Sequence, residues 1–428
     1  MKLIPFFLMF VFMALRMPVG FAMGVAGAIG IWMMSGFSGL MSVLGTSPYR
    51  STASFLLTTI PMFILMAEFA SSGGLARDLF EMARRWIGHI PGGLAVATNW
   101  ASAAFGAMSG SANACAATMS RITIPEMLKA GYSRPLATGV VAMAGTLDPM
   151  IPPSVLMVIY GIATETSIGK LLIAGILPGI LTACLYAIGI YLWVKIDPSA
   201  ARPIPRSSWK ERFESLRSLA PLLALFFVVI GGMYFGVATP SEAAAFGAVG
   251  AFVVCMLMRR LSMEGVIVAL RNTVNITVMI FTIVVGAMIF SYYLTLTQVT
   301  QDLIAYVGML AVPRWVVLFL IVVLYIILGA LLDELGMLLM TLPLTFPLMM
   351  ELGYDPIWFG VIIVALCEVG MVCPPVGMTV FIVNAVTKIP LQEIYKGTLT
   401  LLVWEFIALA LLILFPEIAL FLPSRMGP

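Results

Sequence analysis

The stretch GTLDPMIPPS, residues 145–154, interrupts an apolar segment with one acid and a Pro-Pro pair. A second Pro-Pro pair lies in the other half of the chain, within EVGMVCPPVG at residues 368–377. Proline has no amide hydrogen and disfavours helix in the residue before it. Carbonyl groups freed inside a bilayer must find partners in protein, water or a bound ion. Both stretches therefore predict broken helices, and two breaks that face each other make a good cation site.

We predict that each break lies inside the membrane, because the helical segments on either side of it are too short to cross the bilayer alone. Twelve helical residues span about 18 Å, roughly half the hydrocarbon core of a bilayer. The predicted half-helices are 136–147 and 154–164 around residues 148–153, and 357–367 and 376–386 around residues 368–375. A packing kink is the alternative interpretation, and the occurrence of two breaks at equivalent positions argues against it.

The composition requires lipid as the solvent. Of 428 residues, 61% are hydrophobic and 10% are charged, and the mean hydropathy is +1.08. A soluble domain cannot bury that much apolar surface. We predict an all-α integral membrane protein with about 11–12 transmembrane helices, two re-entrant hairpins and two broken helices. Residues 3–34 form the first membrane segment, which Arg16-Met-Pro18 divides into two pieces.

Charge, histidine and cysteine content exclude several classes of function. The net charge is +3, and no basic run suggests a nucleic-acid partner. His89 is the only histidine, which argues against histidine-based catalysis and against metal sites with several imidazoles. The five cysteines lie in apolar stretches without CxxC spacing, as expected for small core residues. We expect neither a cofactor nor an enzymatic activity.

The two halves of the chain are related by a constant offset in residue number, which takes Pro152 to Pro374. The same offset pairs Gly131-Tyr132 with Gly353-Tyr354, Pro91 with Pro313 and Pro125 with Pro347. Proline and glycine constrain the backbone, so their coincidence in one register predicts that one backbone path is used twice. We predict a first repeat at 1–196, a cytoplasmic linker at 197–217 and a second repeat at 218–428.

Charge predicts that the two repeats are inverted in the membrane. Segment 121–134 holds three basic residues, whereas its counterpart 343–356 holds two acids and no base. Segment 77–85 likewise holds three basic residues, and its counterpart 299–307 holds none. Short basic loops stay in the cytoplasm, so equivalent loops lie on opposite faces. Inverted repeats are the usual architecture of secondary transporters, whose binding sites lie near the midplane.

Small and polar residues precede each predicted break. In FGAMSGSAN at 105–113, Ser109, Ser111 and Asn113 offer oxygen ligands at a tight re-entrant tip. Helix packing through small residues is the alternative, and it explains the glycines but not three polar side chains. The counterpart GALLDE at 329–334 carries Asp333, and an acid in such an apolar stretch is a functional candidate.

Four further acids have different interpretations. Asp148 and Glu368 lie at the two breaks, where each can ligate a cation or carry a proton. Glu242 follows Thr-Pro-Ser and is interpreted as structural, since this pattern starts a helix with an acid in its first turn. Glu68 closes an apolar run, and its role stays open.

Several long motifs follow one another along nearly the whole chain. They are PVGFAMGVAG at 18–27, FGAMSGSANA at 105–114, IPEMLKAGY at 124–132, GTLDPMIPPS at 145–154, TPSEAAAFGA at 239–248, GYDPIWFG at 353–360 and EVGMVCPPVG at 368–377. Together they resemble the DctM-type large membrane subunit of TRAP transporters, the tripartite ATP-independent periplasmic transporters.

The resemblance implies an elevator-type transporter, in which a transport domain moves against a scaffold. It implies Na⁺ as the coupling ion, a small four-helix membrane subunit (DctQ-type) and a periplasmic substrate-binding protein (DctP-type). The implied substrate is an organic acid, such as a C4-dicarboxylate, sialic acid or a related carboxylate. The implied location is the bacterial inner membrane.

The resemblance assigns ion-binding roles to residues within these motifs. The tip at Ser109 to Ser111 and the residues Gly145 and Thr146 would help to form one ion site, and segment 368–375 would contribute to its pseudo-symmetric partner. The predicted ion-binding set is Ser109, Gly110, Ser111, Asn113, Gly145, Thr146, Asp148, Asp333, Glu368, Gly370 and Cys373. The predicted substrate-binding set is Ser111, Pro152, Pro153, Ser154, Pro374 and Pro375.

The sequence departs from the family pattern at several of these positions. Asp148 stands where glycine is usual, Cys373 where Thr or Ser is usual, and Leu366 where an Asn is expected. Cys115 occupies a position that is usually small or acidic. We hypothesise that Asp148 supplies a negative charge lost elsewhere and so alters ion stoichiometry or specificity.

Two alternatives belong to other functional classes, and a third is another kind of transporter. A channel would use the broken helices to line a pore, but an inverted duplication suits alternating access better. An intramembrane enzyme would have only Ser109 or Ser111 with Asp333, and no evident base supports it. A stand-alone anion–Na⁺ symporter of similar fold would need no partner protein.

Overall fold

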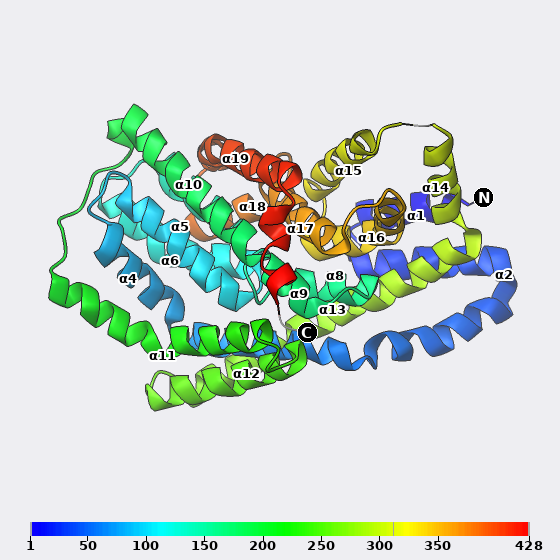
Figure 1. The fold of residues 1–428 in the computed structure, drawn as a ribbon, viewed down its shortest axis with the longest axis horizontal. Helices are drawn as coiled ribbons and strands as arrows, with labels where there is room; N and C mark the ends of the chain where they lie inside the picture. Colours follow the sequence, from blue (N-terminus) through cyan, green and yellow to red (C-terminus); the bar gives the residue numbers. More distant parts are fainter. Residues whose placement is uncertain (1, 311, 427–428) are drawn as a thin grey trace.

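The computed structural model describes residues 2–310 and 312–426, and every regular element within those ranges is a helix (Figure 1). The prediction of an all-α protein is confirmed. In Figure 1 the N-terminus lies at one end of the long axis, near α1, α2 and α14, and α4 and α11 lie at the other end.

The first half contains ten helices of different lengths among the described residues. The sequence 3–34 is divided as predicted, because α1 ends at Ala14 and α2 begins after Pro18. The helices are α1 Ile4–Ala14, α2 Val19–Thr52, α3 Thr59–Ser72, α4 Leu75–Ile87, α5 Gly93–Ser109, α6 Ala112–Lys129, α7 Arg134–Ala144, α8 Val155–Thr164, α9 Ile168–Ala174 and α10 Ile176–Ile196, with 3₁₀ turns at Phe55–Thr58 and Gly145–Leu147.

The second half begins with α11, which already covers part of the polar interval 197–217. Ser208 and Glu211 form a capping box that starts α11 at Trp209. The helices are α11 Trp209–Tyr234, α12 Pro240–Leu257, α13 Met263–Thr297, α14 Val299–Met309, α15 Arg314–Gly329, α16 Glu334–Glu351, α17 Pro356–Val372, α18 Met378–Thr387, α19 Leu391–Leu414 and α20 Glu417–Leu420, with 3₁₀ turns at Pro198–Ala200 and Pro423–Arg425.

Helices of the two halves start in the register of the sequence offset. The hairpin helix α6 begins at Ala112, and α16 begins at Glu334, the position that the offset assigns to Ala112. The half-helix α7 begins at Arg134, and α17 begins at the equivalent position, Pro356. Each half thus contains a hairpin followed by a broken helix. The opposite orientation of the two halves in a bilayer remains a prediction.

Some of the apolar helices are long enough to cross a membrane whole. Six qualify by length and composition among the described residues: Val19–Thr52, Phe55–Ser72, Ile168–Ile196, Pro240–Leu257, Met263–Thr297 and Leu391–Leu414. The bent helix α11 makes a seventh if it is counted as one span. The hairpins and breaks contribute shorter apolar helices, such as α8, α15, α17 and α18. The predicted 11–12 passes therefore depend on how these shorter segments combine.

The long helices α2 and α13 run side by side in Figure 1, and glycines allow their backbones to meet. A Cβ built on Gly27 would lie 2.8 Å from the Phe290 Cα, which is closer than real side chains come. The helix α2 bends at Gly36, whose φ of 67° lies in the left-handed region that glycine tolerates. This pair is closely packed along the part of α2 that precedes the bend.

Two acids that the sequence analysis set aside have structural partners. Thr239 and Glu242 form a reciprocal capping box at the start of α12, which confirms the structural interpretation of Glu242. Glu68 of α3 accepts a hydrogen bond of 2.9 Å from the Asn272 side chain of α13.

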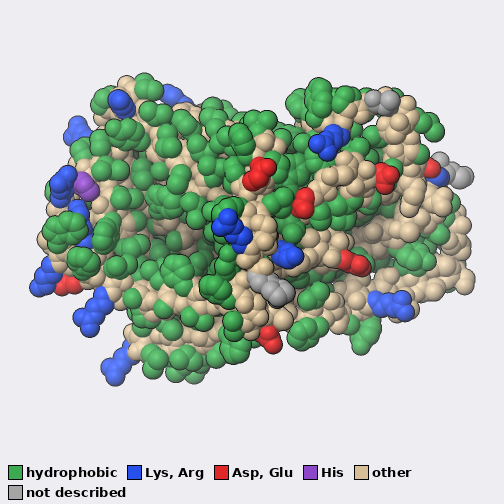
Figure 2. All heavy atoms as spheres, viewed as in Figure 1, with side chains coloured by type: hydrophobic (Ala, Val, Ile, Leu, Met, Phe, Trp, Pro, Cys, Tyr) green, Lys and Arg blue, Asp and Glu red, His purple; other side chains and the backbone are tan. Residues whose placement is uncertain are grey.

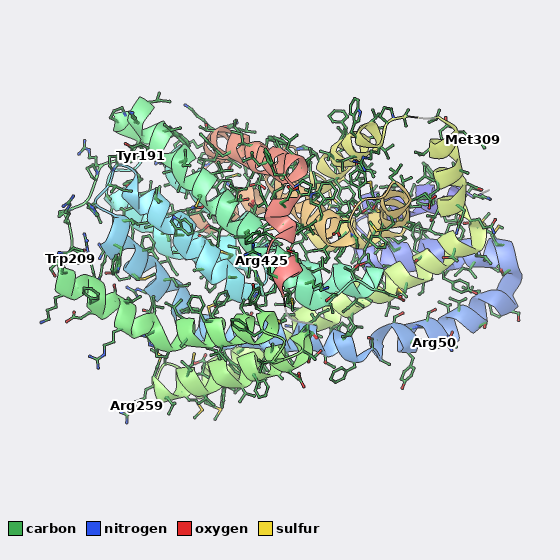
Figure 3. All side chains as sticks on the ribbon, viewed as in Figure 1. Arg50, Tyr191, Trp209, Arg259, Met309 and Arg425 are labelled. Carbon is green, nitrogen blue, oxygen red and sulfur yellow. The ribbon has the colours of Figure 1, made fainter. Side chains whose placement is uncertain are left out.

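Basic side chains gather at one end of the molecule. Figure 2 shows Lys and Arg side chains concentrated over α4, α11 and the segment between α10 and α11, whereas most of the acidic side chains in this view lie toward the centre and the other end. In Figure 3, Trp209 and Arg259 lie toward the basic end and Met309 lies at the opposite end. Apolar side chains cover most of the remaining surface in Figure 2, as a lipid-embedded protein requires.

Candidate functional site

The tip of the first hairpin contacts the first helix break through one short hydrogen bond. Ser109, the last residue of α5, donates from its hydroxyl to Asp148 Oδ2 at 2.6 Å. Asp148 is 0% exposed, and its Oδ1 has no partner among the described residues. The structure therefore brings together two residues that were predicted to bind an ion, and one carboxylate oxygen between the hairpin and the break has no partner among the described residues.

Two glycines shape the protein around Asp148. Gly110 turns the chain between α5 and α6 with a φ of 61°. A Cβ on Gly106 would lie 3.1 Å from both Cα and Cβ of Asp148, so α5 packs directly on this residue. Ser111 starts α6 by accepting the Ala114 amide at 3.4 Å, which gives its hydroxyl a capping role.

The predicted ion-site residue Thr146 lies in a second polar contact that extends to α10 and α19. Its hydroxyl donates to the Met143 carbonyl at 2.7 Å and lies 3.4 Å from the Tyr186 hydroxyl. Tyr186 in turn donates to Glu405, which is 1% exposed. Gly145 opens the 3₁₀ turn before the break, and a Cβ there would lie 3.2 Å from the Ala116 side chain of α6.

The second break begins later than predicted. The helix α17 continues through Val372, so Glu368 and Gly370 lie on a helix and the break covers only residues 373–377. The amide of Cys373 still reaches back to the Val369 carbonyl at 3.1 Å, which extends the helical pattern to the diproline. Proline restricts mainly the residue before it, and Cys373 is that residue. The predicted end of this half-helix at 367 was wrong for that reason.

Glu368 is buried without a hydrogen-bond partner. It is 0% exposed, and neither carboxylate oxygen has a partner among the described residues. An unpaired charge in such a place would be costly, so Glu368 keeps its predicted role as a residue that ligates a cation or carries a proton.

Asp333 has a structural role that the sequence did not reveal. Its side chain accepts the Gly336 amide at 3.0 Å and caps the start of α16. The neighbouring Glu334 instead has a buried Oε2 without a partner among the described residues. Glu334 is therefore the acid at the second hairpin tip with a free oxygen.

The two halves meet at the hairpins and breaks. The Asn113 side-chain amide, near the first tip, lies 3.3 Å from the Met378 sulfur at the start of α18.

At the second tip, a Cβ on Gly370 would lie 2.5 Å from the Gly329 Cα, so α15 and α17 touch backbone to backbone. Asp148 of the first half occupies the position that corresponds to Gly370 in the second.

The residues predicted to contact substrate differ in exposure. Pro152, Pro153 and Ser154 are buried, and Ser154 caps α8 by accepting the Met157 amide at 3.2 Å. Pro374 and Pro375 are exposed, and Tyr395 donates to the adjacent Val376 carbonyl at 2.8 Å. Both Pro-Pro bonds are cis. The predicted roles of these residues remain predictions.

The polar groups gathered at the site are mainly oxygen atoms of hydroxyls and carboxylates. Across residues 2–310 and 312–426, no three His, Cys, Asp or Glu side chains converge to hold a metal ion. The five cysteines are free, and four of them are buried. Hydroxyl, carboxylate and carbonyl oxygens are present instead, and such oxygens are the ligands that hard cations prefer.

The sequence analysis missed Glu405 and its partner Tyr186. The signal was present, since Glu405 interrupts the apolar run LLVWEFIALALLIL of α19, and acids within membrane helices mark functional sites. The contact with Tyr186 joins residues 219 positions apart, so only the folded chain reveals it.

The chain matches the family described as "Tripartite ATP-independent periplasmic transporter, DctM component" over residues 6–418. The chain belongs to this TRAP transporter family. It is therefore a multi-pass membrane protein of a transport system and not an enzyme. The resemblance of the quoted motifs to this family is confirmed.

Named relatives cover nearly the whole chain. It is 36% identical to the "C4-dicarboxylate TRAP transporter large permease protein DctM" of Pseudomonas aeruginosa, over 95% of this chain and 94% of the relative. It is 33% identical to the "Sialic acid TRAP transporter large permease protein SiaM" of Vibrio cholerae, over 95% of each chain. It is 34% identical to the "Ectoine TRAP transporter large permease protein TeaC" of Halomonas elongata, over 95% of each chain.

One solved structure shows the same fold. The YdaH transporter of Alcanivorax borkumensis, described as having an unusual topology, aligns with a TM-score of 0.66 over 94% of this chain and 98% of that one. Its sequence is 15% identical, so the likeness concerns the fold alone.

Proposed function

We propose that this TRAP permease imports an organic acid together with Na⁺ across the bacterial inner membrane. A periplasmic binding protein delivers the acid, and a small four-helix membrane subunit completes the transporter. The observation that carries this proposal is the buried Asp148 carboxylate, held by Ser109 at 2.6 Å with its second oxygen free. A cation at this free oxygen would offset the cost of the buried charge.

The backbone around the site supports binding of an anionic substrate. The helices α6, α8, α16 and α18 each begin directly after a hairpin tip or a break. The N-terminus of a helix presents free amides and a partial positive charge, which favour carboxylate groups. A site of this kind needs no basic side chain to hold an organic acid.

The names of the relatives support a substrate that varies within the family. They include a C4-dicarboxylate, sialic acid and ectoine permease, and a fused isethionate permease called DctMQ in Oleidesulfovibrio alaskensis. We propose a carboxylate for this chain, because the helix starts at the site match a carboxylate group.

We further propose that Asp148 changes how this permease couples to Na⁺. The equivalent position in the second half is Gly370, which leaves no room for a side chain beside Gly329. Asp148 therefore adds a charge to one half of the site only. Such an added charge favours tighter cation binding or a different number of cations for each substrate molecule.

Reconstituted uptake tests the proposed function. The chain and its small membrane partner are placed in proteoliposomes, the cognate binding protein is added outside, and uptake of a panel of radiolabelled organic acids is measured. We expect uptake that requires both an inward Na⁺ gradient and the binding protein. Uptake without the binding protein would favour a stand-alone symporter. Uptake driven by a proton gradient alone would contradict Na⁺ coupling.

A further inference from the structure

A groove away from the two breaks carries three basic residues that the proposed function does not use. It has a volume of about 590 Å³ and lies between the middle of α6, the start of α7 and the end of α18. Arg121, Arg134 and Lys388 line it together with Ser120, and no acidic side chain is among its described lining residues. Arg121 and Lys388 are exposed.

The groove also contains a buried hydroxyl without a partner. Ser120 is 1% exposed, and its Oγ makes no hydrogen bond to any described residue. A buried polar group normally has a partner, since leaving it unpaired costs free energy. Because Ser120 lines the groove, a ligand there can supply the missing partner.

The positive charge of the groove is only partly offset by protein acids. Arg134 lies 3.4 Å from Glu393, while Lys129 outside the groove pairs with Glu126 at 3.4 Å. Neither Arg121 nor Lys388 forms an ion pair within the described part of the chain. Two free cations beside a free hydroxyl match an oxyanion, which accepts charge-assisted hydrogen bonds.

The loop that carries Lys388 is held in place by its own hydrogen bonds. Lys388 has a φ of 61°, and the Asn384 side chain donates to the next carbonyl, that of Ile389, at 2.7 Å. The Ile389 amide donates to the Thr387 hydroxyl at 3.3 Å. This arrangement holds the backbone of the turn that carries Lys388 at the edge of the groove.

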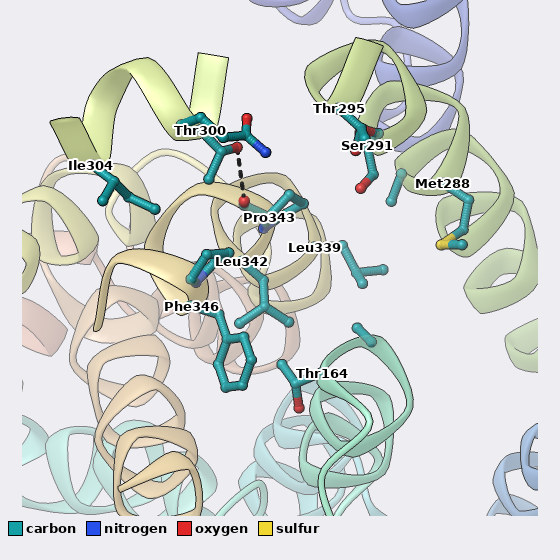
Figure 4. Close-up of a pocket in the computed structure, with 14 residues that line it drawn as sticks. Thr164, Met288, Ser291, Thr295, Thr300, Ile304, Leu339, Leu342, Pro343 and Phe346 are labelled. Atoms are coloured by element: carbon teal, nitrogen blue, oxygen red, sulfur yellow. Dashed lines mark hydrogen bonds between the residues drawn. The ribbon is translucent and has the colours of Figure 1, made fainter. Parts of the chain in front are cut away.

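The chain contains an internal control for this groove. A cavity of about 300 Å³ in the second half is lined by Leu342, Pro343, Phe346 and Pro347 of α16 (Figure 4). The sequence offset between the halves assigns these residues to Ser120, Arg121, Ile124 and Pro125 of the basic groove. The described residues lining this second cavity carry no charge, and in Figure 4 its Thr300 donates to the Pro343 carbonyl at 3.2 Å. Basic residues are therefore not needed to pack a hairpin helix at this position.

We infer that the groove lined by Ser120, Arg121, Arg134 and Lys388 binds an oxyanion, either a carboxylate or a phosphate. The site is separate from the buried residues at the breaks and does not depend on Na⁺ coupling. A free solute and the phosphate of an anionic lipid headgroup share this chemistry. Both present oxygens to Arg121 and Lys388 and accept a hydrogen bond from Ser120.

Binding to the purified full-length chain in Na⁺-free buffer tests this inference. One arm measures the dissociation constants of inorganic phosphate and succinate by calorimetry in a neutral detergent. The other arm measures retention of phosphatidylglycerol against phosphatidylcholine by native mass spectrometry. The first variant combines Arg121→Gln with Lys388→Asn, and the second variant is Ser120→Ala. Asn is chosen at position 388 because it tolerates the left-handed backbone of Lys388. Lys129→Gln is the matched control on the same helix.

We expect the double variant to bind at least one probe about tenfold more weakly, Ser120→Ala to bind severalfold more weakly, and Lys129→Gln to bind as the unmodified chain does. An effect on phosphate or succinate alone identifies a solute site, and an effect on phosphatidylglycerol alone identifies a lipid site. Equal binding of every probe by the double variant and the unmodified chain would overturn the inference, as would the absence of binding by all probes. Unchanged elution on size exclusion verifies that each variant is folded.

Discussion

The Ser109 hydroxyl donates to Asp148 Oδ2 at 2.6 Å and thereby joins a hairpin tip to a helix break. Asp148 is fully buried, and its second oxygen has no partner among the described residues. The hairpin and the break come from segments 39 residues apart, so this one bond ties together the two features that the sequence suggested separately. It also places an acidic side chain where the other half has Gly370.

Ser109→Ala should weaken Na⁺ binding without unfolding the protein. The substitution removes the donor to Asp148 and one oxygen from the proposed ion site. A hydrogen bond to a charged group contributes about 1.5–3 kcal/mol, so the Na⁺ concentration for half-maximal uptake should rise about tenfold or more. The measurement is uptake against Na⁺ concentration in proteoliposomes. Ser424→Ala, at an exposed hydroxyl, is the control, and an identical Na⁺ dependence in both variants would refute this role for Ser109.

Gly370→Ala should destabilise the protein because α15 and α17 touch at this point. The added Cβ would lie 2.5 Å from the Gly329 Cα, and backbone cannot move aside as a flexible side chain can. Overpacking of this kind costs about 1–3 kcal/mol. Gly231→Ala is the control, since a Cβ there meets nothing within 4 Å. Thermal unfolding in detergent, followed by tryptophan fluorescence, should show a lower midpoint for Gly370→Ala only, and equal midpoints would disprove the close contact.

Tyr186→Phe should leave Glu405 without its donor in a buried position. The expected loss of stability is about 1–3 kcal/mol, the cost of an unsatisfied buried polar group. Tyr191→Phe on the same helix is the control, because Tyr191 is 43% exposed. In the double variant Tyr186→Phe with Glu405→Gln, the loss should be smaller than the sum of the two single losses. Strictly additive losses would show that the two side chains do not interact.

Thr239→Ala should lower stability but leave transport by the folded protein intact. Thr239 accepts the Glu242 amide at 3.3 Å, and the Glu242 carboxylate accepts the Thr239 amide at 2.8 Å. Loss of an N-cap costs about 1 kcal/mol. Thr239→Ser retains the hydroxyl and should behave as the unmodified chain does. Uptake per folded molecule is the measurement, and a large loss of uptake with normal stability would assign Glu242 a role in transport.

The sequence predicted the elements of the site because proline, glycine and isolated acids leave strong local signals. The first break was predicted at 148–153, and it lies between the 3₁₀ turn Gly145–Leu147 and the start of α8 at Val155. The helices α6 and α16 begin at positions related by the predicted offset. These features depend on backbone constraints and on the cost of polar groups in lipid, both of which are properties of short stretches.

Contacts between distant segments could not be predicted in the same way. The bond from Tyr186 to Glu405, the packing of Gly329 on Gly370 and the position of Met378 beside Asn113 depend on how helices pack in space. Asp333 was predicted as an ion ligand because it is an acid in an apolar region, and that role stays a prediction; its capping of α16 was not predicted. Capping by Asp follows from the position of the helix start, and the sequence located that start only approximately.

The most direct test of the account compares the Na⁺ dependence of uptake in Asp148→Asn with that of the unmodified chain. Asn keeps the shape of the side chain and the hydrogen bond with Ser109 but removes the charge. Asp302→Asn is the control, since Asp302 is an exposed acid paired with Lys2. The account predicts that Asp148→Asn folds normally, yet needs at least about tenfold more Na⁺ or transports with fewer Na⁺ ions, while Asp302→Asn is unchanged. Full Na⁺-driven uptake by Asp148→Asn at ordinary Na⁺ concentrations would contradict the central role given to this carboxylate.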